Sequence, residues 1–337
     1  MPADLMVRHL GRALHEAMER DPSVLLLGED VLDPYGGAFK VTRGLSERFP
    51  DRVITTPISE AGIVGVAGGL SMLGDKVVVE VMFADFLTLA VDQIVNGLAK
   101  SVAMYGRRAP VHVVVRAASG GRRGYGPTHS QSPQKHFIGV PYLHLYELSP
   151  FHDSSRVFAE MLELGEPCLH FEDKTLYGTV RSEGPLVDGL FRLRFPAGPT
   201  GPAWLTPEGE PHPECVLIAP GGLAARALEA SRRAFAAEEV VCGVLVPTRL
   251  HPWDLGPVAG ILAHARRVVV AEESVGGGTW GADVAHAVHN LAWGTLREPV
   301  RLVHSVSEVI PAAPHLEEQV LVQTDHIVRA LLGGFHA

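Results

Sequence analysis

The chain has 337 residues, of which 46% are hydrophobic, and its formal net charge is −9. The length predicts about two domains, and the composition supports folded cores and excludes a disordered chain. The acidic balance argues against a nucleic-acid partner, which requires a basic surface. No apolar run reaches the ~18 residues needed to span a membrane.

The first 21 residues carry charges throughout and have no apolar stretch of the kind that secretory signals contain. Their apolar side chains fall near one face of an amphipathic helix instead. The three cysteines cannot all pair and lack the spacing of metal ligands, so we interpret them as buried strand residues. Both observations favour a reducing cytoplasm.

Strand-like and helical segments alternate along the first half of the chain, which is typical of a mostly parallel sheet flanked by helices. A stretch at 179–213 that is rich in Pro and Gly predicts a linker. We predict strands at 24–28, 52–55, 76–82, 111–116, 142–147 and 168–172, and helices at 59–73, 85–105 and 152–164.

A second alternating region follows the linker. Its predicted strands are 215–219, 240–246, 267–272 and 300–306, and its predicted helices are 223–235, 253–264, 280–292 and 325–332. The predicted fold class is therefore α/β, with two domains of mostly parallel sheets flanked by helices, at 1–178 and 214–337. This class assigns no function, but it predicts ligands at the C-terminal ends of the strands.

The segment 56–60 (Thr-Pro-Ile-Ser-Glu) leads from a predicted strand into a predicted helix, which Ser59 can cap. On its own, Glu60 would simply complement the helix dipole. The helix nevertheless carries four glycines between residues 62 and 69, and each glycine destabilises a helix interior by about 1 kcal/mol relative to Ala. We therefore expect another backbone, a subunit or a ligand to approach this helix closely.

Two further groups of residues follow predicted strands. Phe83 and Phe86 are either ordinary core residues or an aromatic face on which a planar heterocycle can stack. His129 comes just after a glycine-rich loop at 120–126. It is either a solvated surface histidine or an acid, base or hydrogen-bond donor near neutral pH.

Residues 276–281 (Gly-Gly-Gly-Thr-Trp-Gly) match the G-x-G-x-x-G pattern of dinucleotide-binding loops. The preceding Glu272 and Glu273 would repel a pyrophosphate, so we favour a closely packed helix entry. A non-catalytic or NAD-binding α/β protein is the least favoured interpretation. The sequence has no zinc-ligand spacing, P-loop or nucleophile elbow.

Taken in order, several segments resemble one family. They are Leu27-Gly-Glu-Asp-Val31, Thr56-Pro-Ile-Ser-Glu60, Phe83-Ala-Asp-Phe86, Asp92-Gln-Ile-Val-Asn96, His129-Ser-Gln-Ser132 and Val246-Pro-Thr-Arg-Leu-His-Pro-Trp-Asp254. The chain resembles a diverged β subunit of the 2-oxoacid dehydrogenase E1 component, the transketolase-like group that includes pyruvate, branched-chain and acetoin dehydrogenases. The resemblance implies a pyrimidine-binding domain at 1–178 and a transketolase C-terminal domain at 214–337.

The resemblance also implies roles for single residues. Glu60 matches the glutamate that hydrogen-bonds N1′ of the aminopyrimidine of thiamine diphosphate, and Phe86 matches the aromatic that stacks on that ring. Ile58 and Met82 match its apolar surroundings, and His129 matches the active-site histidine that faces the substrate. A potassium site in some members matches backbone carbonyls at Val113, Met161, Leu162, Leu164 and Glu166.

One motif of the superfamily is missing. The Gly-Asp-Gly motif that binds the diphosphate through Mg²⁺ does not occur in these 337 residues. The resemblance therefore implies an α subunit that holds Mg²⁺, in an α2β2 tetramer. It implies decarboxylation of a 2-oxo acid and acyl transfer to a lipoyl-bearing E2 partner. The alternative is a diverged two-carbon ketol or acyl transferase that delivers to a carrier protein.

Overall fold

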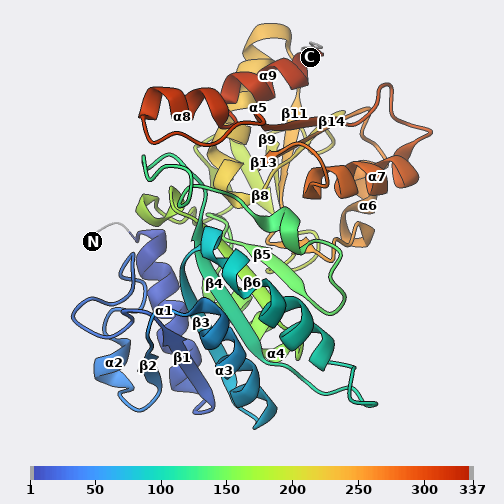
Figure 1. The fold of residues 1–337 in the computed structure, drawn as a ribbon. Helices are drawn as coiled ribbons and strands as arrows, with labels where there is room; N and C mark the ends of the chain where they lie inside the picture. Colours follow the sequence, from blue (N-terminus) through green and yellow to red (C-terminus); the bar gives the residue numbers. More distant parts are fainter. Residues whose placement is uncertain (1–3, 334–337) are drawn as a thin grey trace.

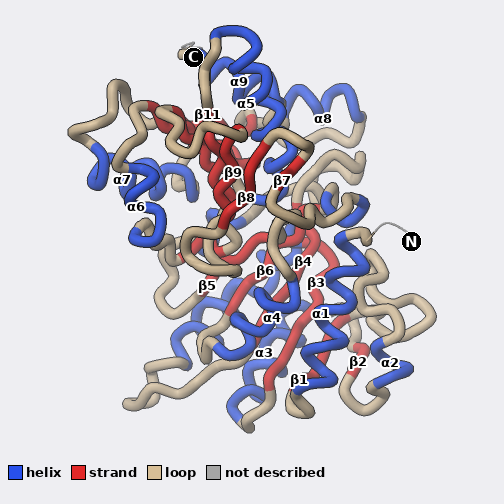
Figure 2. Tube along the Cα trace, turned by 180° about the vertical axis from the view of Figure 1, so that it is seen from behind, coloured by secondary structure: helices blue, strands red, loops and turns tan. Residues whose placement is uncertain are grey.

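Two seven-stranded sheets, one above the other in Figure 1, organise the computed structural model, whose described residues are 4–333. The lower sheet comes mainly from the first half of the chain and the upper sheet from the second half. Figure 2 shows the same two layers from behind, with helices lying against the strands. The predicted α/β class is confirmed.

The first sheet is parallel except at one edge, where β12 pairs antiparallel with β5. Along β3, Val77 and Val79 face one core cluster and Val78 faces another, because successive side chains point to opposite faces. Burial on both faces explains the continuous apolar run. The strand order is β12 (Arg249–His251), β5 (His144–Glu147), β6 (Cys168–Asp173), β4 (Val113–Ser119), β3 (Lys76–Phe83), β1 (Val24–Gly28) and β2 (Val53–Thr55).

Helices cover both faces of this sheet. Helices α1 (Met6–Arg20) and α4 (Ser154–Glu163) pack on one face. Helix α3 (Glu60–Met72) packs on the other, together with the 3₁₀-helix η1 (Ala84–Ala90) and the π-helix η2 (Gln93–Ala99). The shorter helices of this half are α2 (Leu45–Arg48), η3 (Gln134–Phe137) and η4 (Leu176–Gly178).

The predicted helix at 85–105 is helical but not a regular α-helix. It starts as the 3₁₀-helix η1, continues into the π-helix η2, and turns follow from residue 102. The buried positions Leu87, Ala90, Ile94 and Leu98 are three or four residues apart. This spacing does not distinguish a 3₁₀-helix or a π-helix from an α-helix, because residues three or four apart lie on roughly one face in all three.

The second sheet joins a parallel half to an antiparallel one. Strands β14, β13, β10 and β11 are parallel neighbours, whereas β11, β9, β8 and β7 pair antiparallel. The strand order is β14 (Arg301–Ser305), β13 (Arg267–Val275), β10 (Cys215–Ile218), β11 (Cys242–Val246), β9 (Ala203–Pro207), β8 (Phe191–Arg194) and β7 (Leu186–Val187).

Helices α5 (Ala224–Glu238) and α9 (Thr324–Leu332) cover one face of the second sheet, and α7 (Trp280–Ala292) covers the other. The predicted helix at 253–264 is much shorter than expected, because only the 3₁₀-turn η6 (Gly256–Val258) and α6 (Ala259–Leu262) are helical. The remaining helices are η5 (Gly221–Leu223) and α8 (Pro314–Val320).

Two features of the connection between the sheets differ from expectation. The predicted linker at 179–213 contains β7, β8 and β9, so most of it belongs to the second sheet. Its Pro and Gly residues mark the turns of an antiparallel meander. In addition, β12 comes from the second half of the chain but completes the first sheet. Both differences arise from the pairing of strands that are distant in the sequence, which local composition does not predict.

All three cysteines are buried and unpaired, in β6, β10 and β11, as the interpretation of buried strand residues predicts. Among residues 4–333, every helix is too short or too polar to cross a lipid bilayer.

Candidate active site

Glu60 is a buried carboxyl at the first residue of α3. It follows β2 after a four-residue turn and is only 6% exposed. No hydrogen bond to its carboxyl is found among the described residues. The predicted Ser59 cap is wrong, because the Ser59 side chain makes no cap hydrogen bond and lies against Gly62 instead.

A second buried carboxyl, Glu29, follows β1 and interacts with Glu60. Burial, and then the negative charge of Glu60, raise the pKa of Glu29. Its Oε1 atom has no hydrogen-bond partner within residues 4–333. Two buried carboxyls with no cation between them are unfavourable. This corner of the molecule is therefore suited to a ligand that donates hydrogen bonds.

Three aromatic side chains surround His129. Its ring centroid lies 4.7 Å from that of Phe83 and 5.1 Å from that of Phe86, both in edge-on geometry. Tyr125 packs edge-on against Phe83 at 5.7 Å. His129 Nδ1 contacts Thr128 Oγ1 at 2.9 Å, whereas Nε2 has no hydrogen-bond partner in the described part of the chain. The imidazole thus keeps one nitrogen available for proton transfer.

The first domain holds the His129 segment by two polar anchors. Lys174 is completely buried, donates from Nζ to the His129 carbonyl at 2.9 Å and lies over the Phe83 ring. Burial lowers the pKa of Lys174 to about 8, although Asp173 and Asp85 oppose this shift. Asp85 accepts the side-chain amide of Gln131 at 2.8 Å and its backbone N–H at 3.3 Å. No sequence motif had indicated a role for Lys174.

A buried ionic network lies beside this cluster. Arg116 pairs with Glu172, at 2.8 and 2.5 Å, and with Glu80. Burial acts against ionisation of Glu172, but Arg116 and a hydrogen bond from His170 lower the pKa of this carboxyl to about 2. Glu80 in turn accepts the Ala38 N–H at 3.3 Å. Charged residues inside otherwise apolar strands were the signal that sequence reasoning overlooked.

The predicted site residues form two groups at one end of the first sheet. Phe86 and His129 lie together, and Glu60 lies beside Glu29. The groups belong to the C-terminal ends of β1, β2 and β3, as expected for a ligand site in a parallel sheet. No hydrogen bond or ring contact joins Glu60 to His129 within residues 4–333. Met82 is half-buried and Ile58 is 82% exposed.

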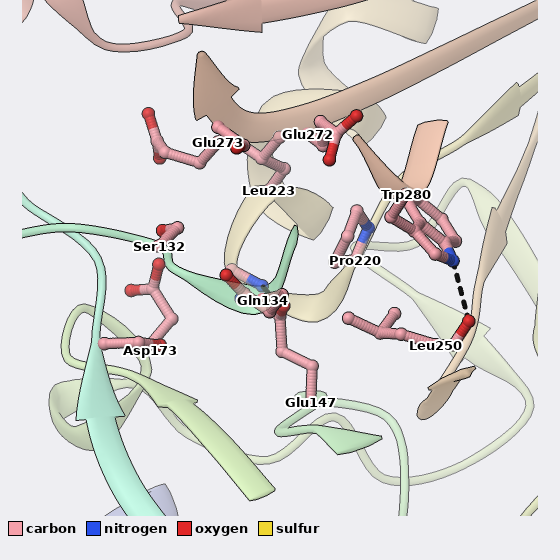
Figure 3. Close-up of a pocket in the computed structure, with 13 residues that line it drawn as sticks. Ser132, Gln134, Glu147, Asp173, Pro220, Leu223, Leu250, Glu272, Glu273 and Trp280 are labelled. Carbon is pink, nitrogen blue, oxygen red and sulfur yellow. Dashed lines mark hydrogen bonds between the residues drawn. The ribbon is translucent and has the colours of Figure 1, made fainter. Parts of the chain in front are cut away.

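A small acidic pocket lies between the two sheets (Figure 3). Glu147 of β5 enters it from the first sheet, and Glu272 and Glu273 of β13 enter it from the second. Glu147 accepts the Gly222 N–H at 3.1 Å and the Gln134 side-chain amide at 3.0 Å. Burial raises the pKa of Glu147 to about 8, so this carboxyl is mostly protonated at neutral pH.

The glycine-rich segment 276–281 does not leave an open phosphate site. Glu272 accepts the Gly281 N–H at 2.8 Å, and the Thr279 side chain caps α7. A carboxylate therefore already occupies the helix N-terminus where a pyrophosphate would bind. This geometry favours the packed helix entry over dinucleotide binding.

Three of the five carbonyls matched to potassium ligands lie near protein donors. The Leu162 carbonyl lies 2.8 Å from His112 Nδ1, which must then carry the proton. The Cys168 thiol lies 3.9 Å from the Met161 carbonyl and 3.5 Å from the Glu166 carbonyl. Potassium binding at these carbonyls stays a prediction.

The chain is similar to known proteins along its whole length. Residues 6–176 match the transketolase pyrimidine-binding domain, and residues 208–327 match the transketolase C-terminal domain. A solved chain described as a split-gene transketolase in an inactive β4 tetramer superimposes with a TM-score of 0.74. It is 20% identical and covers 98% of both chains, which shows a common fold. The matched domains and this fold define a transketolase-like protein.

Two relatives show to which family of transketolase-like proteins the chain belongs. The chain is 33% identical to the pyruvate dehydrogenase E1 component subunit beta of Leifsonia xyli subsp. xyli, over 97% of this chain and 93% of that protein. It is 30% identical to the acetoin:2,6-dichlorophenolindophenol oxidoreductase subunit beta of Cupriavidus necator, over 97% of each. The chain belongs to the family of E1 β subunits that its sequence resembles.

Proposed function

We propose that this chain is the cofactor-activating half of a two-subunit enzyme that depends on thiamine diphosphate. The enzyme decarboxylates a 2-oxo acid and passes the acyl unit to a lipoyl-bearing E2 partner. The observation that carries the proposal is the Glu60 carboxyl, which belongs to a residue only 6% exposed and has no hydrogen-bond partner among residues 4–333. A carboxyl in so enclosed a place, with no protein donor bound to it, leaves its oxygens available to a ligand.

The residues around Glu60 suit an aminopyrimidine ring. In this proposal Glu60 holds a proton at N1′ of the ring, Phe86 stacks on it, and Ile58 and Met82 form its apolar surroundings. The high exposure of Ile58 is then explained, because the cofactor covers this side chain. When bound, thiamine diphosphate supplies the nucleophilic carbon that attacks a carbonyl and holds its electrons.

His129 acts as the acid–base residue that faces the substrate. Its free Nε2 and its position between Phe83 and Phe86 support this role. A neutral imidazole has one nitrogen that donates a proton and one that accepts a proton, so it can do both at the substrate oxygen.

The partner in this proposal is an α subunit, which holds the diphosphate and Mg²⁺. The 337 residues contain no Gly-Asp-Gly motif, and the described residues contain no cluster of metal-binding side chains. The α subunit packs on the exposed face of α3, which starts at Glu60. Val66 and Met72 of this helix are 57% and 55% exposed, and Leu73, which follows its last residue, is 85% exposed.

Replacing Glu60 tests the function. In the complex with the α subunit, Glu60→Ala is expected to lower turnover of 2-oxo acids by at least about 100-fold, because a general acid–base group contributes that much or more. The assay measures oxidation of a panel of 2-oxo acids with an artificial electron acceptor. The matched control is Glu47→Ala, which removes an exposed glutamate from the first turn of α2. Turnover by Glu60→Ala equal to that of the control would remove Glu60 from the mechanism.

A further inference from the structure

The glycine-rich loop at 120–126 packs closely against the second domain. An alanine Cβ at Gly121 would come within 2.6 Å of Leu321 Cδ1 and 2.9 Å of Glu317 Oε1. At Gly124 a Cβ would lie 3.1 Å from the Ala312 carbonyl oxygen. These glycines therefore allow the loop backbone to approach α8 and its neighbours.

Glu317 of α8 anchors the tip of this loop. Its side chain is 3% exposed and accepts two backbone N–H groups, from Arg122 at 2.7 Å and from Gly124 at 3.4 Å. One carboxylate oxygen serves each donor. Hydrogen bonds to an ionised acceptor are stronger than neutral ones, so this carboxylate holds the loop more firmly than a neutral acceptor could.

Arg122 adds a second contact between the loop and the second domain. Its Nη2 donates to both oxygens of Glu273, at 2.7 and 3.0 Å, and to the Val322 carbonyl at 2.6 Å. Arg122 has a φ of 68°, in the left-handed region that non-glycine residues rarely adopt. Such a backbone persists only where surrounding contacts hold it. The ion pair and the Glu317 anchor provide those contacts.

The returning part of the same loop carries His129. The first domain fixes this part through Lys174 and Asp85, as described above. The second domain fixes the tip through Glu317 and Glu273, and beyond His129 it accepts hydrogen bonds from Lys135 Nζ at the Val275 and Gly277 carbonyls. Between these anchors, Gly124 and Gly126 have φ values of 68° and 77°, so the connection is built from residues with wide conformational freedom. Release of the tip from the second domain would leave it held to the first domain through Arg123, whose Nη2 donates to the Lys174 carbonyl at 2.8 Å, and would loosen the connection to the imidazole.

We propose that Glu317 is a positioning residue for His129. It holds the loop tip against the second domain, and the loop in turn keeps the imidazole beside Phe83 and Phe86. This inference rests on the role proposed for His129. It also gives the second domain a part in the reaction, because a residue of α8 controls the geometry of a side chain at the end of the first sheet. A misplacement of about 1 Å can lower a rate about 100-fold.

A double-mutant cycle in the complex with the α subunit tests the inference. The variants are Glu317→Ala, His129→Ala and their combination, and the control is Glu318→Ala, an exposed neighbour on α8. We expect Glu317→Ala to lower kcat by about 10- to 100-fold. The Kd for thiamine diphosphate should stay within about twofold of the unmodified value, since Glu317 makes no contact with the Glu60 corner. In the His129→Ala background the same substitution should change kcat by less than about threefold.

Two results would overturn the inference. One is a Glu317→Ala enzyme as active as the Glu318→Ala control. The other is an equal loss of kcat with and without His129, because independent sites contribute additively. General destabilisation would give that second pattern, so the cycle separates positioning from mere stability.

A second variant covers the case in which Glu317→Ala fails to fold. Gly121→Ala leaves α8 unchanged but forces the loop away from Leu321 and Glu317. The loss of kcat in Gly121→Ala should likewise depend on the presence of His129, and additive losses would overturn the inference here too.

The Glu60→Ala assay distinguishes failure of the positioning role from failure of the proposed function. An inactive Glu60→Ala with a fully active Glu317→Ala would reject the positioning role alone, whereas a fully active Glu60→Ala would reject the proposed function.

Discussion

Glu147 shows what burial between the two sheets does to a single carboxyl. It is 5% exposed and lies near two other acids, Asp173 and Glu273. Burial, followed by the charge of Asp173 and then that of Glu273, raises its pKa to about 8, and the hydrogen bonds from Gly222 and Gln134 only partly oppose this. A protonated carboxyl therefore bridges the two halves of the molecule at neutral pH.

The raised pKa predicts how stability depends on pH. The unfolded chain loses the Glu147 proton near the ordinary value of 4.5, and the folded chain keeps it until about pH 8. Stability from this group is complete below pH 4.5 and is lost as the pH rises to about 8, by up to about 1.4 kcal/mol per pH unit. The substitution Glu147→Gln keeps the shape of the side chain but removes its ionisable proton. It should therefore gain stability over the unmodified protein as the pH rises from 5 to 8.

Thermal unfolding of both proteins at several pH values measures this difference. Glu210→Gln, a change at an exposed position, serves as the control and should shift Tm equally little at every pH. A constant difference between Glu147→Gln and the unmodified protein across this range would contradict the raised pKa.

At the scale of elements, helix α3 combines a buried apolar face with an exposed face that contains a glycine. Ile63, Val64 and Ala67 pack against the first sheet. At Gly68 a Cβ would lie 2.9 Å from Leu98 Cδ2, so that glycine is needed for packing within the chain. A Cβ added at Gly69 would meet no atom within 4 Å, and the residue is exposed. Packing within residues 4–333 gives no reason for this second glycine, whereas a partner subunit does.

Gly69→Ala should therefore have opposite effects on the free chain and on the complex. Alanine in place of a glycine inside a helix stabilises the chain alone by about 1 kcal/mol. The added methyl group should weaken association with the α subunit, because it prevents close approach to α3. Gly260→Ala in α6 also adds a methyl group in open space and should not affect assembly. Unfolding by denaturant and sedimentation of the two-subunit mixture measure the two effects, and unchanged association of Gly69→Ala would contradict the assigned surface.

At the scale of the molecule, the two halves of the chain form one connected unit. Core residues from both sheets, such as Leu145 of β5 and Ile218 of β10, belong to the same cluster. Strand β12 crosses from the second half to pair with β5, and the loop at 120–126 rests on α8. The second domain is thus tied to the end of the first sheet where the candidate site lies.

The cofactor itself should require two chains. We expect thiamine diphosphate with Mg²⁺ to bind the pair of α and β subunits and not this chain alone, because the proposed partner of N1′, Glu60, lies on this chain, whereas its sequence contains no Gly-Asp-Gly motif for the diphosphate. Calorimetric titration of each subunit and of the mixture measures this. Tight binding by the isolated β chain would contradict the divided site.

Much of the fold can be read from local sequence patterns. The apolar runs at 24–28 and 168–172 became buried strands at almost the predicted bounds, and the helix at 280–292 has the predicted limits. Continuous burial of parallel strands and the 3.6-residue period are local properties, so a single chain reveals them. The strands at 186–207 were overlooked because antiparallel turns and linkers share the same Pro and Gly composition.

The candidate site likewise has a part that the sequence predicted and a part that only the tertiary structure showed. The sequence predicted site roles for Glu60, Phe86 and His129, because each follows a predicted strand in a motif that resembles a family. It also showed that the diphosphate motif is missing, which points to a second chain. Only the tertiary structure brought Lys174 to the His129 carbonyl, Glu29 to Glu60 and Glu317 to the loop at 120–126. Those contacts join residues from separate elements, and their energy comes from burial and hydrogen bonding that exist only after the sheets have packed.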